Sequence, residues 1–167
     1  MKEEEILNGI STKFEVEGKI QRKQRIWIKV DKENLIDLCR FVKEIGFEHL
    51  SAISVTDWLK DGEYEVTYHL WSYKDKILLT LKTRIDRDDQ NINSVVPIWG
   101  ENAQIHEREM HEMFGVEFEG NNDLSPLFLE DWEGPPPFRK DFDWGKYVRE
   151  KYYNKKNERE NIYFEEV

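Results

Sequence analysis

Two runs of alternating apolar residues constrain the fold of this chain more than any other feature. Apolar side chains recur at nearly every second position in residues 64–70 and again in residues 77–85, which is the period of a strand with one buried face. A third apolar run, residues 50–58, lies ahead of them, and Asp61-Gly62 separates it from the next run. Because Asp-Gly readily adopts a tight hairpin turn, the three runs predict an antiparallel meander.

Further strands and two helices are predicted around this meander. Short alternating runs at residues 14–20 and 26–30 indicate two strands, and the helical stripe of residues 31–45 ends at Gly46. A second helix ends at Gly115 and has one apolar stripe, formed by Ala103, His106, Met110, Met113 and Phe114. The predicted class is α+β, an antiparallel or mixed sheet with helices packed on one face and the other face partly exposed to solvent.

Composition narrows the classes of partner and cofactor. The chain of 167 residues has a formal net charge of −10, which argues against direct binding to nucleic acid or to an anionic bilayer. No apolar run is long enough to span a membrane, and the first five residues are unlike a signal peptide. Cys39 is the only cysteine, so we expect no metal and no cofactor on this chain. Abundant charged residues with few glutamines favour a heat-adapted source.

Regular periodicity fades after Gly115. Four of the five prolines lie in residues 118–144, among apolar residues that follow no helical or strand period. Such side chains need a surface to pack on. We therefore predict an α+β domain at residues 1–115 and an extended, proline-containing C-terminal segment for docking to a partner at residues 116–167.

Charged residues of the second helix and of the C-terminal segment have alternative interpretations. Arg108 and Glu112 either form a local pair on a solvated face or belong to a contact surface. The proline-stiffened Arg139-Lys140-Asp141 either pairs locally or grips carboxylates of an adjacent subunit, which is the interpretation we prefer. Ten acidic residues and one basic residue lie in residues 101–133. This block either keeps the chain soluble or steers it toward a basic partner. The alternative of another class is a free-standing enzyme that uses the acidic 101–133 region.

Two blocks resemble a known signature. Glu107-Arg108-Glu109, two residues, Glu112, two apolar residues and Gly115 resemble the 30 kDa subunit family of respiratory complex I. That family includes the homologous subunits of membrane-bound nickel–iron hydrogenases and of related membrane-bound sulfur reductases. The likeness runs from about residue 50 to residue 142 and includes Arg139-Lys140-Asp141. Residues 120–126 depart from the family pattern, because the usual His and both Arg are missing.

The resemblance implies a non-catalytic scaffold subunit in the cytoplasmic peripheral arm of a membrane-bound, energy-converting redox complex. It favours a hydrogenase or sulfur-reductase host, with a complex I-type quinone oxidoreductase as the alternative. The implied partners are a hydrogenase-like large subunit and an iron–sulfur small subunit, which carry the iron–sulfur clusters and any nickel–iron centre. The chain is expected on the cytoplasmic side of the cell membrane, in contact with the membrane only through the complex. The implied partner-binding residues are Glu107, Arg108, Glu109, Glu112, Gly115, Asp123, Arg139, Lys140 and Asp141.

Overall fold

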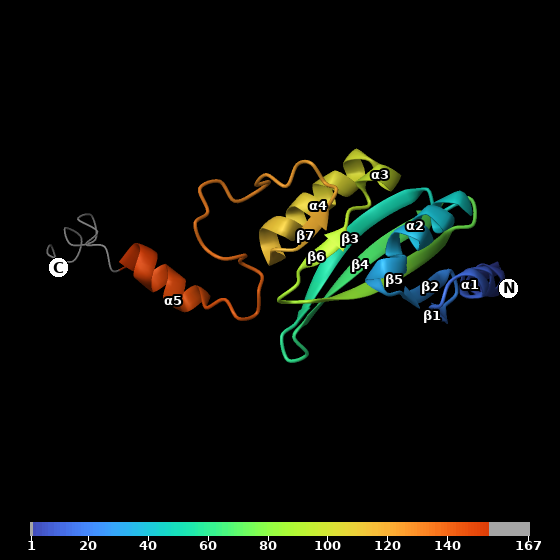
Figure 1. Ribbon diagram of the computed structural model, residues 1–167, viewed down its shortest axis with the longest axis horizontal. Coiled ribbons are helices and arrows are strands. Elements are labelled where there is room, and N and C mark those ends of the chain that lie inside the picture. The colour runs from blue at the N-terminus through green and yellow to red at the C-terminus, as the bar shows by residue number, and fades with distance from the viewer. Residues whose placement is uncertain (1, 154–167) are drawn as a thin grey trace, which may run out of the picture.

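A five-stranded mixed sheet forms the centre of the molecule (Figure 1). The computed structural model describes residues 2–153. The strands run in the order β1-β2-β5-β4-β3, and all neighbours are antiparallel except β2 and β5, which are parallel. The strands are β1 (Glu17–Arg22), β2 (Arg25–Lys29), β3 (His49–Trp58), β4 (Glu63–Ser72) and β5 (Ile77–Asp86). The predicted meander is thus confirmed as β3-β4-β5, and the α+β class is confirmed with it.

Helices pack on one face of this sheet. They are α1 (Lys2–Lys13), α2 (Leu35–Glu44), α3 (Val96–Trp99) and α4 (Glu101–Phe114), with a single 3-10 turn, η1 (Lys32–Asn34), before α2. The sequence did not lead us to expect α1, yet its Ile10 has no exposed surface, and Phe14 just beyond it contacts Phe41 of α2 with ring centroids 5.6 Å apart. Within residues 2–153, no helix has both the length and the apolar character needed to cross a bilayer.

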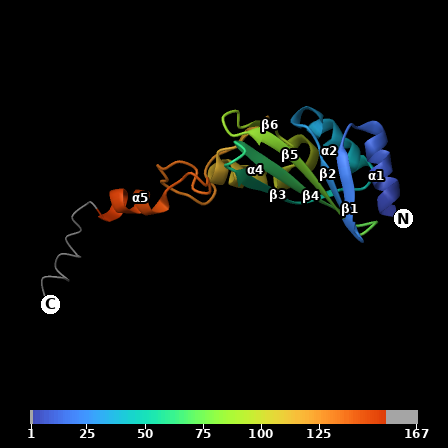
Figure 2. The same ribbon diagram turned by 90° about the horizontal axis from the view of Figure 1, so that it is seen from below.

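The strand register separates a buried face from a partly exposed one. Tyr64, Tyr68 and Leu70 of β4 lie opposite Ile85, Leu81 and Leu79 of β5, and all six are buried beneath the helices. Alternate residues of the same strands, such as His69 and Thr80, point to the opposite face. No helix of the described chain covers that second face (Figure 2). The expected one-sided packing is therefore observed.

The packed part of the chain continues beyond Gly115, where we placed the domain boundary. Gly115 ends α4 with φ of 82°, as expected for a left-handed helix cap. The chain then enters the core through Val116 and Phe118, both buried. Strand β7 (Glu117–Glu119) pairs in parallel with β6 (Asn91–Asn93) to form a second, two-stranded sheet. Residues 116–119 therefore fold with the sheet domain.

The segment after β7 leaves the sheet domain, and α5 (Trp144–Val148) stands clear of it in both views (Figures 1 and 2). A short π-helical turn, η2 (Arg149–Tyr153), follows α5. Four aromatic rings give this segment an internal cluster, with centroids from 4.9 to 6.4 Å apart: Trp132, Phe142, Trp144 and Tyr147. The part of the predicted docking segment from residue 154 onward lies outside the described residues.

Candidate docking site

Glu107 is the buried member of the signature on α4. It lies one helical turn after Ala103 and one before Met110, on the stripe that faces the core. Its carboxylate accepts hydrogen bonds from the Ser94 hydroxyl at 2.7 Å, the Val95 amide at 2.7 Å and the Asn121 side-chain amide at 2.9 Å. Burial raises the pKa of Glu107, and the three donors oppose that rise. Glu107 therefore joins α4 to the segment before α3, at residues 94–95, and to the segment after β7, at residue 121.

Arg108 holds the chain that follows β7. Its guanidinium donates to the Ser125 carbonyl at 3.1 Å, the Ser125 hydroxyl at 3.1 Å and the Pro126 carbonyl at 3.0 Å, and lies 3.8 Å from an Asp123 carboxylate oxygen. Asp123 in turn accepts from the hydroxyl and the amide of Ser125, and these bonds lower the pKa of Asp123. The alternative of an Arg108–Glu112 pair is wrong, because the returning chain occupies the guanidinium.

Glu112 binds the next part of the same loop. Its carboxylate accepts from three successive backbone amides, those of Leu127, Phe128 and Leu129, at 3.2, 3.0 and 2.7 Å. Bonds from backbone N–H groups to a carboxylate are charge-assisted and stronger than neutral ones. Arg108 and Glu112 thus fix residues 123–129 along the outer side of α4.

Glu109 is the member of the Glu-Arg-Glu run that faces away. In the part of the chain that the structure describes, no residue forms a hydrogen bond or an ion pair with its carboxylate. Ile105, one turn earlier on the same helix, is 51% exposed. The outer side of α4 therefore presents an apolar side chain next to an acidic one.

A second set of ion pairs fastens the end of the irregular segment to the sheet domain. Arg139 forms a bidentate pair with Asp141 at 3.1 and 3.1 Å, and Asp141 also pairs with Arg87 at 3.0 Å. Arg87 reaches the buried Asp57 at 3.0 Å, and the same Asp57 accepts from the backbone amide of Lys140 at 2.9 Å. The hydrogen bonds from Arg139, with a smaller contribution from Arg87, hold the pKa of Asp141 well below its usual range. Arg139 and Asp141 thus pair within this chain.

Lys140 has a different position from its neighbours. Its side chain is exposed, and among residues 2–153 it has no ion-pair partner. Apolar side chains are exposed along the same segment, with Phe128 at 64%, Phe138 at 59% and Trp144 at 47%. The segment therefore combines an anchored backbone with partly exposed aromatic side chains and an exposed cation, which suits protein docking.

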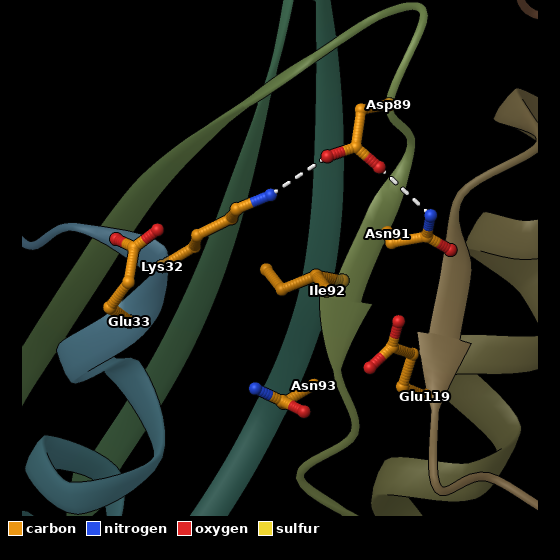
Figure 3. Close-up of a pocket in the computed structure, with 7 residues that line it drawn as sticks. All are labelled: Lys32, Glu33, Asp89, Asn91, Ile92, Asn93 and Glu119. Carbon is orange, nitrogen blue, oxygen red and sulfur yellow. Dashed lines mark hydrogen bonds and ion pairs between the residues drawn. The ribbon is translucent and has the colours of Figure 1, made fainter.

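A small polar pocket lies apart from these residues, at the edge of the β6–β7 pair (Figure 3). Asp89 accepts from Lys32 at 3.1 Å and from Asn91 at 2.8 Å across its mouth. The cavity measures about 220 Å³, and Glu33 and Glu119 also line it. None of the predicted docking residues reaches it. The Lys32–Asp89 pair connects η1 to the loop before β6.

Comparison with known proteins identifies the family. The pattern of the family described as respiratory-chain NADH dehydrogenase, 30 kDa subunit, matches residues 28–148. One subunit of the F(420)H(2) dehydrogenase of Methanosarcina mazei is 36% identical over 143 residues, which cover 83% of this chain and 90% of that protein. One subunit of the NADH-quinone oxidoreductase of Roseiflexus sp. is 34% identical, with 71% of this chain and 70% of that protein covered.

Solved structures agree with the sequence comparison. A chain of the membrane-bound sulfane sulfur reductase, an archaeal respiratory membrane complex, superimposes with a TM-score of 0.84 and 37% identity over 92% of each chain. A trypsin-resistant fragment of Nqo5 superimposes with a TM-score of 0.63 and 25% identity, over 74% of this chain and 100% of the fragment. The chain therefore belongs to the family of the 30 kDa subunit of respiratory-chain NADH dehydrogenase.

Proposed function

We propose that this chain is a non-catalytic scaffold subunit in the peripheral arm of a membrane-bound, energy-converting redox complex. Its relatives are subunits of oxidoreductase complexes. The observation that carries the proposal is the use of the signature residues Glu107, Arg108 and Glu112, whose side chains fasten a projecting segment to the sheet domain. An anchored segment loses little conformational entropy when it binds, so more of its contact energy appears as affinity.

The host we favour is a sulfur-reductase or hydrogenase type of complex. The 37% identity over 92% of both chains supports the sulfur-reductase type. A complex I-type quinone oxidoreductase is the second candidate, supported by the NADH-quinone oxidoreductase relatives. Assay of the purified host complex with polysulfide, protons or a quinone as electron acceptor distinguishes the three.

The proposed partners are a hydrogenase-like large subunit and an iron–sulfur small subunit, which carry the redox centres. Cys39, the only thiol, supports this division. It has no exposed surface, and burial raises the pKa of its thiol well above the usual range, whereas a metal ligand must be a thiolate. Elemental analysis of the purified chain should find less than about 0.1 iron, nickel or zinc atom per chain. About one metal per chain would contradict the proposal. The complex would face the cytoplasm.

Docking through the projecting segment can be tested by two substitutions that leave the internal ion pairs intact. Lys140→Glu together with Phe128→Ser removes a free cation and a side chain that is 64% exposed. We expect the melting temperature of the isolated chain to change by less than about 2 °C, since neither side chain is buried. The amount of this chain in the purified complex should fall at least about tenfold, because desolvated aromatic and charged contacts dominate binding energy.

The matched control is Tyr73→Ser on the turn between β4 and β5, at the end of β4 far from Asp57. Tyr73 is also 64% exposed, so its loss removes an equally exposed aromatic ring away from the segment. This variant should co-purify at normal stoichiometry. Normal recovery of the Lys140→Glu, Phe128→Ser chain would count against docking through this segment.

A further inference from the structure

The uncovered face of the sheet has a chemical character unlike the rest of the molecule. The register places Trp27, Thr80 and His69 in one row across β2, β5 and β4. Arg25, Leu78 and Trp71 form the adjacent row on one side, and Lys29, Lys82 and Thr67 form the row on the other. Cations thus line β2 and β5, and two tryptophans lie among them.

Cations are concentrated in the β1–β2 hairpin. The hairpin, residues 17–29, contains five basic residues, Lys19, Arg22, Lys23, Arg25 and Lys29, and one acidic residue, Glu17, which lies opposite Lys29. The whole chain has a net charge of −10, so this hairpin is strongly positive on a negative molecule. In the described structure, Arg25 and Lys29 have no ion-pair partner. Lys82 is already paired with Glu65 at 2.5 Å.

Protection of a sheet edge does not account for this pattern. Lysine on an edge strand discourages pairing with other chains, which suffices for Lys19 on β1. Strand β2, however, is hydrogen-bonded on both sides, to β1 and to β5, and needs no such protection. Arg25, Trp27 and Lys29 all lie on β2 and point to the uncovered face. Arginine and tryptophan are the residue types most enriched at the energetic centres of protein interfaces.

Trp27 is held in place by a neighbouring lysine. The Lys19 ammonium lies 5.3 Å from the Trp27 ring centroid, a cation–π contact that holds both side chains in place. Burial lowers the pKa of His69, with smaller contributions from Lys82 and Arg25. Its Nε2 atom lies 3.4 Å from the Ser54 hydroxyl of β3.

We propose that this basic sheet face, defined by Lys19, Arg25, Trp27, Lys29 and Trp71, binds an acidic segment of a neighbouring protein in the host complex. Carboxylates would meet the unpaired cations of β2, and apolar side chains would pack on the two tryptophans. The two tryptophans favour a protein segment over a phosphate ligand, because apolar side chains can pack on them and a phosphate group cannot. The inference rests on membership of a complex but not on docking through the C-terminal segment.

Photo-crosslinking in the assembled complex tests the face directly. Thr80→p-benzoylphenylalanine places the probe between Trp27 and His69, with no change of charge. We expect a crosslink to another subunit, within a segment where Asp and Glu clearly outnumber Lys and Arg. No crosslink, a crosslink to lipid, or a crosslink to a segment without excess acid would overturn the proposal. The same probe at Phe128 tests the contact of the C-terminal segment. The two probes therefore test the two proposed surfaces independently of each other.

A binding measurement on the full-length chain supplies a second test. Titration with a decaglutamate peptide should give a saturable change in tryptophan fluorescence. About 0.5 M NaCl, roughly three times physiological ionic strength, should abolish this change, because salt screens the attraction between exposed charges. Arg25→Glu with Lys29→Glu should weaken binding at least about tenfold. Arg22→Glu with Lys23→Glu makes the same change of charge on the hairpin turn and should weaken it less than about threefold.

The outcomes separate the alternatives. If the Arg25→Glu, Lys29→Glu chain and the Arg22→Glu, Lys23→Glu chain lost equal affinity for decaglutamate, the effect would be one of overall charge, and a site on the face would be overturned. Tighter binding of a fifteen-nucleotide oligothymidylate, or of vesicles of phosphatidylglycerol, than of decaglutamate would also overturn it. Arg25→Gln with Lys29→Gln repeats the test without reversed charge in case the glutamate variant folds poorly. This pair should weaken binding by about threefold or more.

Discussion

At the scale of single residues, Glu107 shows how a charged side chain can serve packing. Its carboxylate is fully buried, yet all three groups that reach it are donors. A carboxylate can satisfy three donors, whereas a carboxamide offers one acceptor oxygen and brings two N–H donors of its own. The position therefore suits a carboxyl group, with two acceptor oxygens, although burial raises its pKa.

We predict that Glu107→Gln lowers the free energy of unfolding by about 1–3 kcal/mol, because at least one buried donor loses its acceptor. Urea denaturation followed by circular dichroism measures the change. Glu109→Gln, two positions along the same helix, should change stability by less than about 0.5 kcal/mol. Equal effects of the two substitutions would mean that the three hydrogen bonds of Glu107 contribute nothing specific.

Gly115 gives a second prediction at this scale. Its φ of +82° is unfavourable for side chains, and a Cβ there would lie 3.0 Å from both Gln90 Oε1 and Pro136 Cγ. We predict that Gly115→Val destabilises the fold by more than about 1 kcal/mol. Gly62→Val, at φ of +71° with no atom within 4 Å, experiences the same backbone strain without the contacts. If a thermal melt showed that Gly62→Val lowers the melting temperature as much as Gly115→Val does, the contacts at Gly115 would contribute nothing beyond the backbone strain.

At the scale of elements, strands with one buried face were predictable and locally unusual elements were not. The period-two pattern specifies β4 and β5 because each alternate side chain enters the core. In contrast, α1 has a weak apolar stripe, and β6 and β7 are three-residue strands that pair only because α3 and α4 bring them together. Pairing between short distant segments leaves no local pattern in the sequence.

The docking residues show the same limit. The helix predicted to carry them is observed as α4, but the sequence did not indicate that Arg108 and Glu112 bind the chain's own loop, because that loop has no regular period. Ser94 and Asn121, which bind Glu107, and Asp57 and Arg87, which bind residues 140 and 141, were not predicted, because their partners lie in distant parts of the sequence. One signal was available: Ala103, Glu107, Met110 and Phe114 follow a helical stripe, which predicts an inward Glu107.

The loop contacts of Glu112 give a prediction for this element. Glu112→Ala removes the acceptor of three consecutive amides, at Leu127, Phe128 and Leu129. Hydrogen exchange of peptides covering residues 126–130 should accelerate at least about tenfold, while exchange in β4 and β5 stays unchanged, because the loop opens without global unfolding. Glu109→Ala is the control and should alter neither region. Acceleration across the whole chain in the Glu112 variant would contradict a local role.

At the scale of the whole molecule, two sets of contacts join the projecting segment to the sheet domain. The first is the α4 set, in which Arg108 and Glu112 hold residues 123–129. The second is the ion-pair network from Asp57 through Arg87 and Asp141 to Arg139. Between them the four-ring aromatic cluster packs the segment on itself. The direction in which this segment leaves the domain is therefore set by the chain before any partner binds.

The contribution of the ion-pair network to stability can be measured through Asp141. Arg139 and Arg87 lower its pKa in the folded state, so the unfolded chain binds the proton more readily. The stabilisation is complete above the unfolded pKa of about 3.9 and is lost as the pH falls through the folded value. Because the Asp141 side chain is 42% exposed, we expect a contribution of only about 0.5–1 kcal/mol.

We predict that Asp141→Asn lowers the free energy of unfolding by this amount at pH 7 and at pH 5, and that its difference from the parent chain narrows at pH 3. Urea denaturation at the three pH values measures the difference. Glu130→Gln, at an exposed carboxyl group, should show no difference at any of them. If the difference in free energy of unfolding between Asp141→Asn and the parent chain grew as the pH fell, folding would raise the pKa of Asp141. The two arginines would then not hold the segment through Asp141.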